Sequence, residues 1–171
     1  GEYASSKSLS VLIGTAIVMS LALVVTKALA KNSEDSKLLF VNSYYIIIRN
    51  FFITLLILFP VTLLFQRDFS MTALFLMGFV FNELIHVALA FFQSRGDFVT
   101  SSKQIFARTL LYGIGAWIIV LQGFSIIFLI VFQVFILFLF FIIAHVSIPK
   151  NEKIFKTTST PNVKTLSLIH I

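Results

Sequence analysis

The residues in this sequence that are best suited to binding or catalysis are ionisable side chains inside long apolar runs. Arg49 lies about eleven residues into the second such run, beside Asn50. An ionised side chain at that depth of a membrane costs at least about 2.5–3.5 kcal/mol, so Arg49 should face a cavity or a partner rather than lipid. Two interpretations stay open: a cation that binds a pyrophosphate or an acidic sugar, or a side chain that extends its head to the interface.

Glu83 and His86 form a second candidate site. They are three residues apart in the third apolar run, so both project from one helix face. The pair is compatible with a coupling-ion or proton site, with half of a metal site, or with a simple hydrogen-bonded pair. A metal would need more ligands, and neither His145 nor Asp97 has ligand spacing. Arg49 is a possible ion-pair partner of Glu83, and that pairing would make Glu83 structural.

Basic residues near the ends of apolar runs form a third group. Arg108 and Lys103 lie near the start of the fourth expected span, and Lys27 lies near the end of the first. Such residues commonly orient a protein in the membrane without touching a ligand. The alternative is a phosphate clamp at the inner mouth of a cavity, for which the bidentate guanidinium of Arg108 is well suited.

No motif of a known catalytic site accompanies these residues. The sequence has no phosphate-binding loop, no serine nucleophile motif, no H-E-x-x-H and no carboxylate pair with catalytic spacing. It has no cysteine, which excludes disulfides, thiol catalysis and thiolate metal sites. We therefore expect neither an enzyme nor a bound cofactor. A membrane enzyme built on Glu83 and His86 would need a third polar ligand or nucleophile converging on them.

The composition indicates an all-α membrane protein. Hydrophobic residues make up 58% of the chain, charged residues 12%, and the mean hydropathy is +1.01. Soluble domains have about 45–50% apolar and 25% charged residues, so no soluble fold hides this much apolar surface. The net charge of +6 does not indicate nucleic-acid binding, because the basic residues lie between apolar runs.

The lengths of the apolar runs predict about five transmembrane helices. Residues 9–30, 38–65 and 69–92 are each long enough to cross an apolar core of about 30 Å. The run 105–146 would make one helix of roughly 63 Å, so it must fold back. Gln122-Gly123 is the only plausible break, which divides it into 105–121 and 124–146.

The basic residues then predict the orientation of the bundle. With five spans, ten of the 13 Lys and Arg residues fall on one side, two on the other and Arg49 within a span. The ten are Lys27, Lys31, Lys37, Arg95, Lys103, Arg108, Lys150, Lys153, Lys156 and Lys164. The positive-inside rule places the start of the chain outside and the tail in the cytoplasm.

The chain is expected to hold one domain and a tail. Residues 1–154 form the transmembrane bundle, which occupies the lipid bilayer, and residues 155–171 form a disordered tail. Residues 166–171 resemble a translated sequencing adapter, so they enter no functional argument.

Three short segments resemble one transporter family. Gly1-Glu2-Tyr3-Ala4, followed by Lys27 and Ala30, resembles the second transmembrane helix of polysaccharide (O-antigen type) flippases, which belong to the multidrug/oligosaccharidyl-lipid/polysaccharide exporter superfamily. The block 90–108 resembles that family's link between the fourth and fifth helices. Gly123-Phe124-Ser125 resembles its outer turn into the sixth helix.

The resemblance implies a fragment, helices two to six, of a transporter that flips lipid-linked oligosaccharide across the cytoplasmic membrane. Its partner would be a pyrophosphate-bearing lipid, moved by alternating access without ATP hydrolysis in this chain. One alternative is a five-helix half of a drug/metabolite transporter, to which Gly96-Asp97 and Trp117 can be matched. Another is a non-catalytic membrane subunit, with Arg49 and Glu83 paired and no cavity between the helices.

Overall fold

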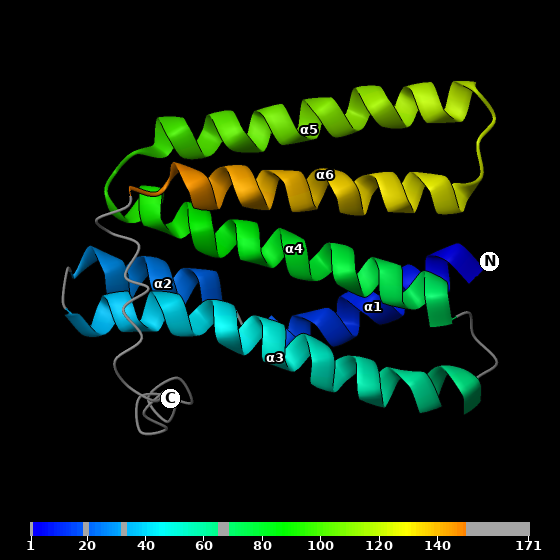
Figure 1. Cartoon of the computed structure of the whole chain (residues 1–171), viewed down its shortest axis with the longest axis horizontal. Coiled ribbons are helices and arrows are strands. Elements are labelled where there is room, and N and C mark those ends of the chain that lie inside the picture. Colours follow the sequence, from blue (N-terminus) through cyan, green and yellow to red (C-terminus); the bar gives the residue numbers. More distant parts are fainter. Residues whose placement is uncertain (1, 19–20, 32–33, 65–68, 150–171) are drawn as a thin grey trace.

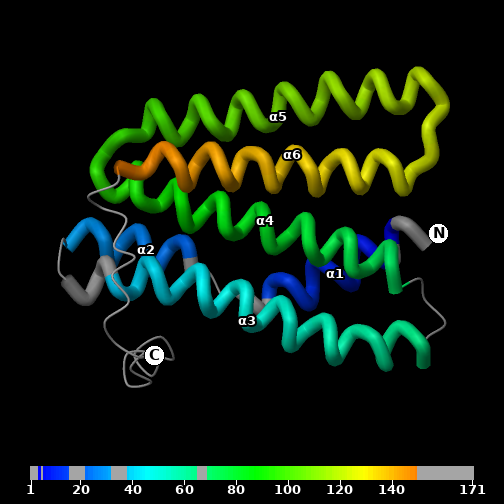
Figure 2. Tube along the Cα trace, in the orientation of Figure 1, coloured from blue at the N-terminus to red at the C-terminus, as the bar shows by residue number. Residues whose placement is uncertain are grey.

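The computed structural model is a layered bundle of α-helices (Figures 1 and 2). It describes residues 2–18, 21–31, 34–64 and 69–149, and this part of the chain contains no strand. The helices are α1 (Glu2–Val18), α2 (Leu21–Ala30), α3 (Glu34–Leu64), α4 (Phe69–Ser94), α5 (Phe98–Leu121) and α6 (Ile126–Ser147). The basic tail and residues 155–171, including 166–171, lie outside the described residues, as does Arg67.

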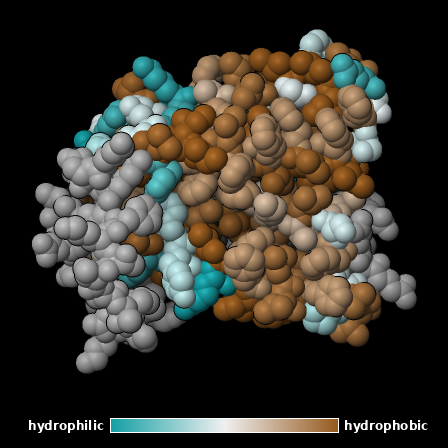
Figure 3. Space-filling view, viewed as in Figure 1, coloured by the Kyte–Doolittle hydropathy of each residue, from teal (hydrophilic) through white to brown (hydrophobic). Residues whose placement is uncertain are grey.

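The chain is an all-α membrane protein, as its composition predicts. Four described helices are long and apolar enough to cross a membrane: Leu38–Leu64 of α3, then α4, α5 and α6. Large apolar side chains are exposed on their outer faces, with Leu56 exposed by 77% and Trp117 by 66%. On the face in Figure 3, brown hydrophobic residues cover the middle of the bundle. Lipid rather than water is the solvent that accommodates such a surface.

The first expected span, residues 9–30, falls on two described helices. Helix α1 begins at Glu2 and ends at Val18, α2 begins at Leu21, and the two residues between them lie outside the described residues. The two helices have different neighbours, because α1 packs mainly on α4 whereas α2 packs on both α3 and α4.

The predicted break at Gly123 is confirmed. Gly123 has a φ of 72°, a conformation that side chains with a Cβ rarely adopt. Its N–H donates to the Val120 carbonyl at 3.0 Å, and the N–H of Phe124 donates to Ile119 at 3.2 Å. These two bonds satisfy carbonyls at the end of α5 and form a Schellman motif. The chain therefore reverses within four residues, and α5 and α6 form a hairpin.

The connection between α4 and α5 has the same glycine cap, and α5 begins earlier than predicted. Gly96 has a φ of 75°, and its backbone N–H donates to the Gln93 carbonyl. The backbone N–H of Asp97 donates to the Phe92 carbonyl. Asp97 then caps α5, because its carboxylate accepts the Thr100 N–H at 3.0 Å. The helix therefore begins at Phe98 and not at residue 105, since capping sets a helix start whereas hydropathy marks only its apolar part.

Helix α4 is the centre of the bundle. It packs against α1, α2, α3 and α6 and makes a smaller contact with α5 (Figure 1). Its buried side chains include Leu76, Val87 and Leu89, all fully enclosed. Buried hydroxyls bond to helix carbonyls: Ser10 Oγ lies 2.8 Å from the Ser6 carbonyl and 2.9 Å from the Thr72 carbonyl. The second contact ties α1 to α4.

The helix ends collect at two sides of the bundle (Figure 1). The end of α2, the start of α3, the α4–α5 connection and the end of α6 lie at one side. The start of α1, the start of α4 and the α5–α6 turn lie at the other. Exposed Lys27, Lys31, Arg95 and Lys103 belong to the first side and Lys7 to the second. This arrangement agrees with the alternation of spans expected from the sequence.

The Asp97 cap of α5 should weaken at low pH. Hydrogen bonds from Thr100, with help from the charge of Lys103, hold the pKa of the Asp97 carboxyl below its ordinary value. A depressed folded-state pKa means that the stabilisation is present above about pH 4 and is lost as the pH falls below it. We expect the protection factors of amides in the first turn of α5, which compare their exchange rates with those of an unfolded chain at the same pH, to fall as the pH drops below about 4. Asp97→Asn, which keeps a capping oxygen without a titrating proton, should remove that fall, and an unchanged pH profile in Asp97→Asn would contradict the assignment.

Candidate ligand cavity within the helix bundle

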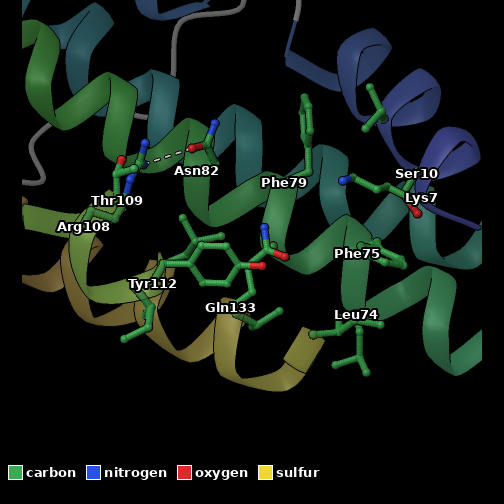
Figure 4. A pocket seen from close by; sticks show the side chains of 16 residues that line it. Lys7, Ser10, Leu74, Phe75, Phe79, Asn82, Arg108, Thr109, Tyr112 and Gln133 are labelled. Carbon is green, nitrogen blue, oxygen red and sulfur yellow. Dashed lines mark hydrogen bonds between the residues drawn. The ribbon is translucent and has the colours of Figure 1, made fainter. Parts of the chain in front are cut away.

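A cavity of about 290 Å³ lies between α1, α4, α5 and α6. Its lining residues come from all four helices, as Figure 4 shows. The polar members are Lys7, Ser10, Asn82, Arg108, Thr109, Tyr112 and Gln133. Apolar side chains such as Phe75, Phe79 and Leu137 complete the wall. A cavity with a few convergent polar groups in an apolar wall is the usual form of a small-molecule site.

The lining has a positive character. Two of its residues carry cations, Lys7 from α1 and Arg108 from α5, and none of the lining residues is acidic. In Figure 4 these two side chains lie toward opposite ends of the cavity, with Tyr112 and Gln133 between them. Electrostatic interactions are strong in this low-dielectric setting. The cavity is therefore suited to an anionic group that also accepts hydrogen bonds.

Asn82 joins a cation and a carboxylate at the side of the cavity. Arg108 Nη1 donates to Asn82 Oδ1 at 3.0 Å, which links α5 to α4 (Figure 4). The amide nitrogen of Asn82 donates to Glu83 Oε1 at 3.5 Å, a longer and weaker contact. The Asn82 amide oxygen thus accepts from the cation, and the amide nitrogen donates to the carboxylate, so both groups of the amide are bonded. Asn82 fixes the position of Arg108 without neutralising its charge.

Glu83 and His86 are both half-buried on α4. Arg108 lies close enough to His86 for a Coulombic interaction. The structure therefore links two of the predicted residues, Glu83 and Arg108, through the amide of Asn82, and His86 lies one helical turn after Asn82 on α4. Within the described ranges, no three His, Cys, Asp or Glu side chains cluster in a way that would hold a metal ion. Asn82 and Arg108 supply hydrogen bonds and charge, and neither is a nucleophile.

Arg108 lies deeper than its place in the sequence suggested. It was expected near the start of a span that began at residue 105, where it would serve an inner mouth. Because α5 begins at Phe98, Arg108 lies ten residues into the helix, roughly 15 Å from its start. Asn82, its partner, lies near the middle of α4. The two residues meet near the middle of the bundle, and the inner-mouth position is corrected to mid-depth.

Arg49 and Lys27 lie apart from this cavity. Neither belongs to its lining. Arg49 is exposed on α3, where its Nη2 and Nε lie 3.2 Å and 3.4 Å from Asn50 Oδ1. Lys27 is exposed in the last turn of α2. The suggested pairing of Arg49 with Glu83 is absent from the structure, since both side chains are described and their hydrogen bonds go to Asn50 and Asn82 respectively.

Two important residues were missed in the sequence. Asn82 stands directly before Glu83 in the third apolar run, and a second polar residue beside an ionisable one was the available signal. Lys7, one of the two basic residues on the less basic side of the expected spans, also lines the cavity, because α1 begins at Glu2 and includes it. Gln133, a polar residue within the fifth expected span, also lines the cavity.

Comparisons with known proteins identify no relative of this chain. No family model, no curated protein and no solved structure matches the chain. The resemblance to polysaccharide flippases therefore stays a prediction from short sequence segments.

Proposed function

We propose that this bundle is part of a membrane transporter that flips lipid-linked oligosaccharide across the cytoplasmic membrane, and that its cavity receives the pyrophosphate-bearing headgroup. The observation that carries the proposal is the cavity of about 290 Å³ with Lys7 and Arg108 in its wall and no acidic lining residue. A polar, cationic space inside an apolar bundle serves an anionic solute that crosses or enters the membrane.

The size of the cavity fits part of such a substrate. Small-molecule sites occupy about 300–1,000 Å³, so 290 Å³ lies just below that range. A pyrophosphate with its nearest sugar fits this class of volume better than a whole oligosaccharide does. The lipid chain of the substrate would lie against the apolar outer faces of the helices, which already face lipid.

Arg108 is the residue best suited to hold the phosphate. A guanidinium forms two parallel hydrogen bonds to phosphate oxygens, whereas the ammonium of Lys7 acts as a point charge. Asn82 holds only Nη1 of Arg108, so the remaining N–H donors stay available to a ligand. Gln133 and Tyr112 lie between the two cations and would bond to sugar hydroxyls.

The distribution of basic residues supports an orientation. Lys27, Lys31, Arg95 and Lys103 lie at one end of the bundle, and the positive-inside rule assigns that end to the cytoplasm. The start of α1 then lies outside. The lining from α4 and α6 comes from their outer halves, residues 74–82 and 130–137, so the cavity reaches from mid-depth toward the outside. In an alternating-access cycle, a cavity so placed would serve the outward-facing state.

A binding measurement tests the proposal. The chain in lipid nanodiscs should bind a fluorescent polyprenyl pyrophosphate more tightly than the matching polyprenol. Arg108→Ala should weaken this binding at least about tenfold, because a hydrogen bond to a charged group contributes about 1.5–3 kcal/mol. Arg95→Ala removes the same side chain from an exposed site over the Phe91 ring and should change affinity less than about twofold.

Two results would contradict the proposal. Equal affinity for the pyrophosphate lipid and the polyprenol would show that the cavity does not select phosphate. Equal loss in Arg108→Ala and Arg95→Ala would show that the bulk charge of the protein, and not the cavity, attracts the probe. In cells that depend on the protein for surface polysaccharide, Arg108→Ala should lower that polysaccharide while Arg95→Ala should leave it unchanged.

A further inference from the structure

The outer face of α3 carries exposed side chains at the spacing of a helix–helix seam. Tyr45, Arg49, Phe52, Leu56 and Leu63 follow one another at intervals of four, three, four and seven residues. Tyr45, Phe52, Leu56 and Leu63 are exposed by 56%, 60%, 77% and 63%, and Arg49 is also exposed. Together these intervals span 18 residues, which is five turns of an α-helix at 3.6 residues per turn, so the five side chains lie on one side of α3. We call these five residues the outer α3 stripe.

The stripe lies at an edge of the bundle. Helix α3 forms the lower edge of the view in Figure 1, opposite α5. The inner side of α3 is occupied, since Ile47 and Leu58 are fully buried in the core. The outer α3 stripe therefore remains uncovered by the described helices.

Arg49 breaks the apolar character of the stripe near mid-depth. It lies eleven residues from Leu38 and fifteen from Leu64, or roughly 16 Å and 22 Å along the helix. Its only hydrogen-bond acceptor in the described part of the chain is the neutral amide oxygen of Asn50. The described carboxylate nearest the middle of a span, Glu83, accepts from Asn82 on α4. A cation so placed needs an anion that the described helices do not provide.

The geometry of the guanidinium defines the missing partner. Nε and one Nη2 hydrogen point to Asn50, which leaves Nη1 and the other Nη2 hydrogen for a second acceptor. These two nitrogens form an end-on pair that matches the two oxygens of a carboxylate. We propose that the outer α3 stripe docks a transmembrane helix that carries an Asp or Glu near the middle of the bilayer. This inference does not depend on the proposed transport function.

A second copy of the chain is a poor candidate for this partner. Two stripes facing each other around a twofold axis would bring two Arg49 side chains together at low dielectric, where like charges repel strongly. The stripe itself contains no carboxylate to balance them. Charge complementarity therefore favours a different helix, with the exposed Phe52 and Leu56 packing beside the ion pair.

Synthetic peptides test this inference whatever the identity of the natural partner. The chain has no cysteine, so Ser102→Cys gives one exposed labelling site on α5. Energy transfer in phosphatidylcholine vesicles would report association with a leucine-rich transmembrane peptide that carries one central Glu. Peptides with a central Gln or Lys are the comparison. We expect the Glu peptide to associate at least about tenfold more tightly than the Lys peptide, and Arg49→Leu to remove that preference.

Variants of the apolar part of the stripe separate docking from charge attraction. Leu56→Ala should weaken association of the Glu peptide several-fold. Leu121→Ala is the matched control, because Leu121 is 66% exposed on α5, outside the stripe, and should leave association unchanged. Equal association of all three peptides, or a Glu preference that survives Arg49→Leu, would overturn the inference. Loss of the preference when phosphatidylglycerol is added would also overturn it, since Arg49 would then be reaching lipid headgroups.

Discussion

Asn82→Leu should destabilise the bundle by roughly 2–4 kcal/mol, because it leaves two charged groups without their hydrogen-bond partner. Leucine has a similar shape to asparagine, so the change creates little cavity and mainly removes the amide. Arg108 loses its 3.0 Å acceptor and Glu83 loses its 3.5 Å donor. The Arg108 bond is the shorter, and its loss should dominate. Denaturation by SDS in mixed micelles, followed by circular dichroism, measures the effect.

Gln133→Leu is the matched control for this prediction. It makes a similar exchange of an amide for an apolar group at the same cavity. No charged group among the described residues loses a partner, so Gln133→Leu should be nearly neutral or slightly stabilising. A loss as large as that of Asn82→Leu would mean that any polar change in the cavity is destabilising, and the link between Arg108 and Glu83 would then carry no special weight.

Gly14→Ala should destabilise the protein by roughly 1–3 kcal/mol through overpacking between α1 and α4. A Cβ at Gly14 would lie 2.5 Å from Cδ1 and 2.7 Å from Cγ of Phe79. Because Cγ is the root of the ring, a rotation about the ring axis does not relieve this clash and the whole side chain must move. Phe79 also lines the cavity, so the same variant should weaken binding of the pyrophosphate lipid.

Gly113→Ala provides the comparison in an uncrowded place. An added Cβ there meets no atom within 4 Å, so the variant should be neutral or gain up to about 1 kcal/mol from helix propensity. In a Phe79→Leu background the cost of Gly14→Ala should fall, because the clashing ring is absent. Equal stability of Gly14→Ala and Gly113→Ala would contradict the close contact between α1 and α4.

The parts of the fold that follow from local chemistry were predictable. Apolar runs of about one membrane thickness predict membrane spans whatever their neighbours are, and α3, α4, α5 and α6 fit that prediction. The turn at Gly123 was also predictable, since a 42-residue apolar run exceeds the bilayer and glycine suits a positive φ. The start of α5 was missed because the cap at Asp97 lies in a polar segment that hydropathy ignores.

The sequence by itself determined that this protein is helical, that it lies in the membrane and where its last hairpin turns. Those properties depend on the length and polarity of each segment. Only the tertiary structure decided that Arg108 meets Asn82 and that Arg49 is exposed away from Glu83. An apolar helix face is equally compatible with lipid and with another helix, so hydrophobicity does not specify its rotation or its neighbours. Side-chain packing between helices makes that choice, and the cavity exists because of it.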